Sequence, residues 1–109
     1  MATFNPEHEK VLKMMMSDIP GAKAAKMFGM PAYKVNGKLA VALFQTAGIV
    51  AKVGPARAKE LIGKSGVETF EPMTGRAWKD WVLLTDHFDA NRALFEEAVE
   101  YVMSETASS

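Results

Sequence analysis

The sequence contains no cysteine among its 109 residues. This absence excludes disulfides, a thiol nucleophile and any zinc or iron–sulfur site that needs Cys ligands. It also fits a reducing compartment, because disulfides are typical of oxidising ones. Long hydrophobic runs are missing too: none approaches the roughly 20 apolar residues of a membrane-spanning helix, and the N-terminal residues include acids instead of an apolar leader. We therefore expect one cytoplasmic domain, residues 1–109, that has no contact with a membrane.

Acidic residues are missing from a long central stretch. From Ile19 to Lys59 the chain has no Asp or Glu. Its seven basic residues in this stretch are Lys23, Lys26, Lys34, Lys38, Lys52, Arg57 and Lys59. From Glu60 onward ten acids accompany four bases, so the net charge of zero conceals a basic middle and an acidic end. Either these two halves lie against each other, or the middle forms a patch that faces anions. The zero net charge makes direct binding of nucleic acid an unfavoured alternative.

Recognisable catalytic and cofactor motifs are absent as well. His8 and His87 have no companion at the spacing of metal ligands. The triplet Gly-Lys-Ser at 63–65 lacks the earlier glycine of a phosphate-binding loop, since that position is Ala58, and the triplet ends a helix instead of starting one. We therefore expect a non-enzymatic protein with no catalytic residue, no metal and no cofactor.

Proline and glycine mark the ends of three predicted helices. Asn before Pro at 5–6 combines a preferred helix cap with a residue suited to the first turn, and Gly-Pro at 54–55 also begins a helix. The predicted helices cover residues 5–19, 55–62 and, capped by Asp86 or Asp89, up to about residue 103. The polar residues 104–109 are expected to be frayed.

The first predicted helix carries several methionines. Its apolar stripe consists of Val11, Leu12, Met15, Met16 and Ile19. The run Met14-Met15-Met16 is open to two interpretations, a soft and adaptable binding surface or part of the core. Helical spacing favours the core.

Residues 32–45 give the clearest local prediction in the chain. Asn36-Gly37 stands between two alternating runs, and both positions of such a two-residue hairpin turn need positive φ, which Asn and Gly tolerate. Further strands are predicted at 22–28, 49–53, 70–73 and 78–85. The order α-β-β-β-β-α-β-β-α predicts the α+β class, a two-layer sandwich in which helices cover an antiparallel meander sheet.

Alternation along the hairpin assigns its side chains to two faces of the sheet. One face receives Tyr33, Val35, Leu39, Val41 and Leu43. The other face receives Lys34, Lys38, Ala40, Ala42 and Phe44. We expect the second face to be flat and partly apolar.

Blocks of the sequence resemble the TfoX N-terminal domain family. They are MFGMPAYKVNGKLAVALF at 27–44, VAKVGP at 50–55, FEPMTGRAWKDWVLL at 70–84 and the acidic amphipathic helix that follows. The resemblance covers about residues 8–103. A similar hairpin occurs in YdhG-like proteins, and its pairing with the third block favours the TfoX-like assignment. The matching motif positions are Met27, Phe28, Gly29, Met30, Pro31, Gly37, Lys52, Pro72, Gly75, Arg76, Lys79 and Trp81.

This resemblance implies a regulatory role. The founding members of the family are regulators of natural competence, in which a separate helical domain follows this one. The present chain has no such second domain in its 109 residues, so the competence role is not expected to transfer directly. The family supplies no established catalytic residues to assign here.

Two candidate surfaces follow for a protein that acts by binding another protein or a second copy of itself. The candidate interface is the second face of the meander: Lys34, Ala40, Ala42, Phe44 and Val50. The alternative is a groove for a small molecule or anion, with cations beside an aromatic wall: Met27, Met30, Lys52, Arg76 and Trp81. The stretch KMFGMPAYKVNGK at 26–38 then either only ends one strand and starts the next hairpin, or forms part of that groove.

Overall fold

The computed structural model describes residues 6–27, 29–44, 48–64, 66–71, 75–86, 88 and 91–107. Within these residues the chain forms three helices and six strands in the predicted order. The helices are α1 (Pro6–Met16), α2 (Pro55–Leu61) and α3 (Arg92–Ala107). The strands are β1 (Ala22–Met27), β2 (Met30–Val35), β3 (Lys38–Phe44), β4 (Gly48–Lys52), β5 (Val67–Thr69) and β6 (Trp81–Leu84).

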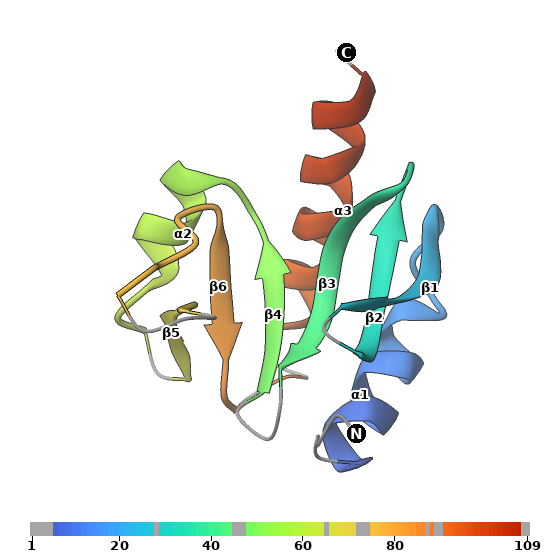
Figure 1. Ribbon diagram of the computed structural model, residues 1–109, viewed down its shortest axis with the longest axis horizontal. Coiled ribbons are helices and arrows are strands. Elements are labelled where there is room, and N and C mark those ends of the chain that lie inside the picture. The colour runs from blue at the N-terminus through green and yellow to red at the C-terminus, as the bar shows by residue number, and fades with distance from the viewer. Residues whose placement is uncertain are drawn as a thin grey trace.

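The strands form one antiparallel sheet in the order β1-β2-β3-β4-β6-β5. Helices α1 and α3 pack on the same face, behind the sheet in the view of Figure 1, whereas α2 lies beside β6. The predicted α+β two-layer sandwich is confirmed. No helix in the described part of the chain is long and apolar enough to span a membrane.

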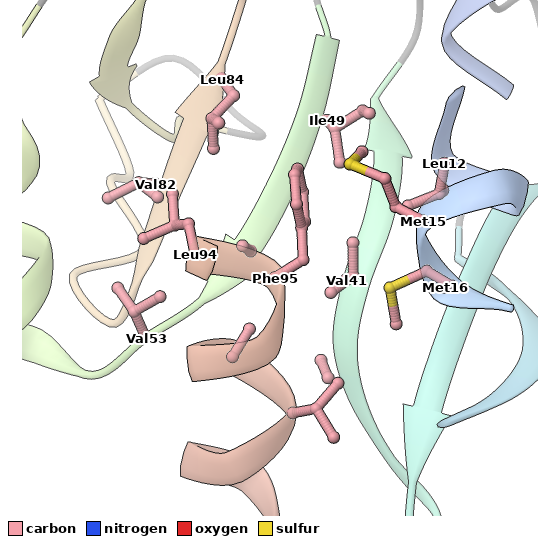
Figure 2. Close-up of a cluster of buried hydrophobic side chains, with 14 of the residues drawn as sticks. Leu12, Met15, Met16, Val41, Ile49, Val53, Val82, Leu84, Leu94 and Phe95 are labelled. Carbon is pink, nitrogen blue, oxygen red and sulfur yellow. The ribbon is translucent and has the colours of Figure 1, made fainter. Parts of the chain in front are cut away.

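The main core lies between the sheet and helices α1 and α3. Figure 2 shows Phe95 reaching from α3 toward the sheet, with Met15 and Met16 on the neighbouring α1. Both methionines are almost completely buried, whereas Met14 is 67% exposed. The core interpretation of the methionine run is therefore confirmed for Met15 and Met16. Met14 points to solvent because it lies on the outer side of the same helix.

Helix α3 is longer than the sequence predicts. It continues to Ala107, so residues 104–107 belong to the helix. The extra turn is held from two sides. The Thr106 hydroxyl donates to the carbonyl oxygen of Val102 at 2.9 Å and accepts from Asn36 Nδ2, in the β2–β3 turn, at 2.8 Å. Tertiary contact therefore extends the helix beyond the point where its polar composition suggests an end.

The strands after α2 are shifted from their predicted places. The strand predicted at 70–73 lies instead at Val67–Thr69, and the strand predicted at 78–85 is confined to Trp81–Leu84. Residues 72–74 lie outside the described residues. Trp78 instead forms part of a turn, in which its N–H donates to the Phe70 carbonyl at 2.9 Å and its carbonyl accepts from the Trp81 N–H at 3.1 Å.

A β-bulge divides the hairpin and corrects the face assignment. Tyr33 pairs with Val41 but Lys34 pairs with Leu39, so Ala40 is one extra residue in β3. The extra residue reverses the alternation. Leu39, predicted to share a face with Val41, packs on the opposite face, and Ala40, predicted to lie with Ala42, packs into the core under the helices. These two assignments were therefore wrong, and so was that of Lys38, which pairs with Val35 and shares its face.

Candidate functional site

The structure brings only part of the predicted ligand groove together: Trp81 shares a cluster with Met27 and pairs with Lys52 across the sheet, but not with Met30. Met27 packs on the sheet face that is turned away from α1 and α3, whereas Met30 belongs to the core under those helices. Arg76 is exposed in the segment that precedes β6. Because Met27 and Met30 are both at least 95% buried in different clusters, they cannot line one open groove.

Lys52 is occupied by an ion pair with the last helix. Its Nζ lies 2.9 Å from Glu105 Oε1, and 18% of the Lys52 side chain and 32% of the Glu105 side chain are exposed. The hydrogen bond from Lys52, followed by the Coulombic attraction of Lys52 and Lys38, lowers the pKa of Glu105. The nearby Tyr101 hydroxyl has its pKa raised, first by burial and then by the charges of Asp80 and Glu105. The pair joins β4 to α3, so its evident role is to hold the fold.

This ion pair predicts a pH-dependent stability. A carboxylate whose pKa is lower in the folded chain stabilises it fully above its ordinary value of 4.5, and loses this effect as the pH falls through the lower folded pKa. We expect Glu105→Gln to lower the free energy of unfolding at pH 7 by less than about 1 kcal/mol, since the pair is partly exposed. The difference from the unmodified chain should vanish in strong acid. Urea denaturation across the pH range measures both.

The exposed Glu100 on the same helix supplies the matched control. Glu100→Gln changes the charge equally and is expected to leave the stability nearly unchanged both at pH 7 and in strong acid. An equal loss for both variants at pH 7 would contradict the assignment to Lys52.

Trp81 belongs to an aromatic cluster on the sheet face opposite α1 and α3. Phe70 is its centre, with no exposed surface. The Phe70 ring centroid lies 4.9 Å from that of Phe44, 5.2 Å from that of Trp78 and 6.1 Å from that of Trp81. The first two contacts are edge-to-face, the geometry that aromatic quadrupoles favour. Trp81 is 6% exposed, whereas Trp78 is only half-buried and reaches the surface.

The same aromatic cluster covers part of the predicted interface. Ala42 and Val50 belong to this hydrophobic cluster and have no exposed surface, so they offer no contact area to a partner. Lys34 and Phe44 are half-buried. Ala40, as the bulge requires, lies on the other side. Aromatic side chains, and no described helix, therefore cover the face that was expected to be flat and open.

A groove lies beside this cluster, between α2 and the residues that precede β6. It has a volume of about 520 Å³. Its lining residues are Pro55, Lys59, Ile62, Thr69, Ala77, Trp78 and Lys79. We call it the α2–β6 groove. Lys59 and Lys79 are exposed, and Ile62 is 37% exposed.

Local backbone chemistry sets the two walls of the α2–β6 groove. Gly54 has φ of 94°, which an L-residue rarely adopts, and it places Pro55 in the first turn of α2. Ile62 leaves the helix in an extended conformation, with its N–H donating to the Ala58 carbonyl at 2.9 Å. On the other wall, the hydrogen bond between Trp78 and Phe70 fixes the turn. The groove is thus built from anchored segments.

The lining of the α2–β6 groove suits binding better than catalysis. Among the described lining residues, Lys59 and Lys79 are the only titratable side chains, and Thr69 brings the only hydroxyl. The described lining offers no carboxylate or imidazole to accept a proton from that hydroxyl. Two ammonium groups next to an aromatic ring and an exposed Ile62 can instead attract an anionic ligand that also has an apolar part.

Sequence reasoning pointed near this groove but missed it. Trp78 and Lys79 stand between the predicted Arg76 and Trp81, and the third sequence block contained three of the seven lining residues. Lys59 and Ile62 come from α2, and no local signal joins them to a segment almost twenty residues later. The exposed Ile62, at the end of an otherwise polar helix face, was the available clue.

The uneven charge distribution is explained in part by contacts between the two halves. Arg57 donates from Nε to Glu97 Oε1 at 2.8 Å, and Lys52 contacts Glu105 at 2.9 Å. These pairs join the basic middle to the acidic α3. Lys59, by contrast, lines the groove. The interpretation that the two halves lie against each other therefore describes part of the structure, and the anion-facing patch stays a prediction.

A smaller hollow lies between the end of α1 and α3. It has a volume of about 330 Å³ and is lined by Asp18, Ile19, Pro20, Glu96, Val99, Glu100 and Met103. Asp18 pairs with Arg92 at 2.7 Å. Among the described residues, no group of three His, Asp or Glu side chains is placed as metal ligands are.

No family model matches the chain, and neither a curated protein nor a solved structure matches it.

Proposed function

We propose that this chain is a non-enzymatic cytoplasmic binding domain that associates with an acidic segment of another protein through the α2–β6 groove. One observation carries the proposal: Ile62, one of two large hydrophobic side chains exposed in the described residues, lies in the same groove as two lysines. An exposed apolar side chain with cations around it favours a partner that presents a carboxylate next to an apolar side chain. A regulatory, TfoX-like role remains a prediction of the sequence.

The proposal predicts binding of a short acidic peptide. The probe is a peptide in which leucine lies between two glutamates, titrated into isotope-labelled protein. We expect chemical-shift changes at Lys59, Ile62 and the Trp78 indole. Lys59→Gln combined with Lys79→Gln should weaken binding about tenfold, which corresponds to ~1.4 kcal/mol. The control Lys10→Gln combined with Lys13→Gln removes the same charge from the exposed side of α1 and should bind normally.

Inorganic phosphate separates this proposal from the alternative of a small-anion site. A peptide that perturbs Ile62, where phosphate does not, supports a protein partner. If phosphate binds as tightly as the peptide and perturbs only the lysines, the groove is an anion site and the protein partner is refuted. Equal weakening by both double variants would show that the effect is only general charge.

A second copy of the chain is the second candidate partner. It is favoured by the exposed Glu96 and Glu100 on α3, which are complementary in charge to Lys59 and Lys79. Sedimentation velocity over a concentration series measures this directly. A salt-sensitive dimer that is lost in the Lys59/Lys79 variant would support the homodimer. A monomer at every concentration would exclude it.

A further inference from the structure

Strand β1 forms one outer edge of the sheet (Figure 1). It is six residues long, and among the described strands it pairs with β2 alone. One edge of its backbone therefore retains peptide groups that can form a further ladder. Strand β5, at the other end of the sheet, has only three residues. Of the two edge strands, β1 is therefore the one that is long enough to pair with a further strand.

The side chains of β1 give this edge a defined pattern. Lys23, Ala24 and Lys26 are exposed, and Ala25 is half-buried. Because alternate residues of a strand point to opposite faces, Lys23 and Lys26 lie on different faces of the sheet. Lys23 pairs with Lys34 of β2, which adds a second cation on its face. The two residues between these lysines are alanines, and their small methyl side chains leave room for the side chains of an adjoining strand.

We propose that β1 binds an extended acidic segment of another protein as an additional strand of the sheet. The backbone ladder supplies sequence-independent affinity, and side chains at alternate positions supply selectivity. In such a strand, the residues opposite Lys23 and Lys26 are three positions apart and face opposite sides. Glutamate or aspartate at these two places forms opposite-charge cross-strand pairs.

The same lysines argue against a second copy as the occupant. Two β1 strands paired with each other would bring four lysines to one seam, with Lys34 beside them on each side. Like charges at neighbouring cross-strand positions are destabilising, and lysine on an edge strand is a known means of preventing self-pairing. The occupant is therefore a strand of opposite charge.

The test uses the full chain and a labelled peptide of threonine and valine that carries two glutamates three positions apart. We expect it to bind with chemical-shift changes and increased amide protection at Ala22–Met27. A peptide with glutamines in place of the glutamates should bind about tenfold more weakly at low salt. Lys23→Gln combined with Lys26→Gln should cause a similar loss. Lys10→Gln combined with Lys13→Gln should cause none.

Several outcomes would overturn the β1 proposal. One is equal binding of the glutamine peptide, and another is equal loss in the two double variants. A third is a dimer of the free chain with protected β1 amides. A fourth is that the peptide perturbs Lys59 and Trp78 and leaves β1 unchanged. This result would support binding at the α2–β6 groove and refute binding at β1. Conversely, shifts confined to β1 would support the edge and leave the groove to its own test with the leucine-containing peptide.

Discussion

Phe70→Ala is expected to lower the free energy of unfolding by about 3–5 kcal/mol, the range for removing a fully buried aromatic side chain. Phe70 has no exposed surface and contacts three aromatic rings, those of Phe44, Trp78 and Trp81. Its removal leaves a cavity on the sheet face that no described helix covers, so no nearby helix can move in to fill it. Equilibrium urea denaturation, followed by tryptophan fluorescence, measures the loss.

Phe70→Leu serves as the matched control, because it keeps most of the buried apolar surface. We expect it to cost clearly less than Phe70→Ala. A loss below about 1 kcal/mol for the alanine variant would mean that the aromatic cluster is not a packed core. Trp78 also lines the α2–β6 groove. Phe70→Leu should therefore weaken peptide binding there by more than the loss of folded protein alone would explain.

Gly48→Ala is expected to be the second severe substitution, costing at least about 3 kcal/mol. A Cβ at position 48 would overlap the carbonyl oxygen of Leu84 and lie 2.9 Å from its carbonyl carbon. The Cα of Thr85 would be 3.2 Å away. These are backbone atoms at the end of β6, and moving them means breaking the pairing of β4 with β6. Thermal and urea unfolding of the variant measure the cost.

Gly37→Ala separates steric overlap from backbone strain. Gly37 has φ of 85° and no atom within 4 Å of an added Cβ, so alanine there meets strain alone, about 1 kcal/mol. A cost for Gly48→Ala that does not exceed the cost for Gly37→Ala would contradict the close approach of β4 to β6. A larger cost isolates the steric contribution.

Local signals were sufficient for the fold class and for most of its elements. Pro6 and Pro55 mark the observed first residues of α1 and α2, and Asn36-Gly37 forms the predicted turn, with φ of 52° and 85°. These residues act through backbone geometry that does not depend on distant parts of the chain. The weakly predicted strand at 22–28 is present as β1, since pairing with β2 compensates for its alanine-rich composition.

The site could not be derived in the same way. The predicted groove assumed that two cations and one aromatic residue among the matched motif positions converge, but Lys52 is engaged by Glu105, fifty-three residues away. The observed groove joins Lys59 of α2 to Lys79, and only the tertiary placement of α2 beside β6 makes them neighbours. The predicted interface failed to account for Phe70, which packs over Ala42 and Val50 in a cluster that local periodicity does not reveal.

The bulge at Ala40 constrains how this hairpin can change in length during evolution. Because of the extra residue, Leu39 faces the aromatic cluster and Val41 faces the helices. In a regular strand, residues two positions apart would share a face. Deleting Ala40 would remove the bulge, keep Leu39 opposite Lys34 and leave it on the face turned away from the helices. Related chains are therefore expected to differ in length by one residue at the bulge, and not elsewhere in β3, where a single-residue change would turn the residues beyond it to the other face.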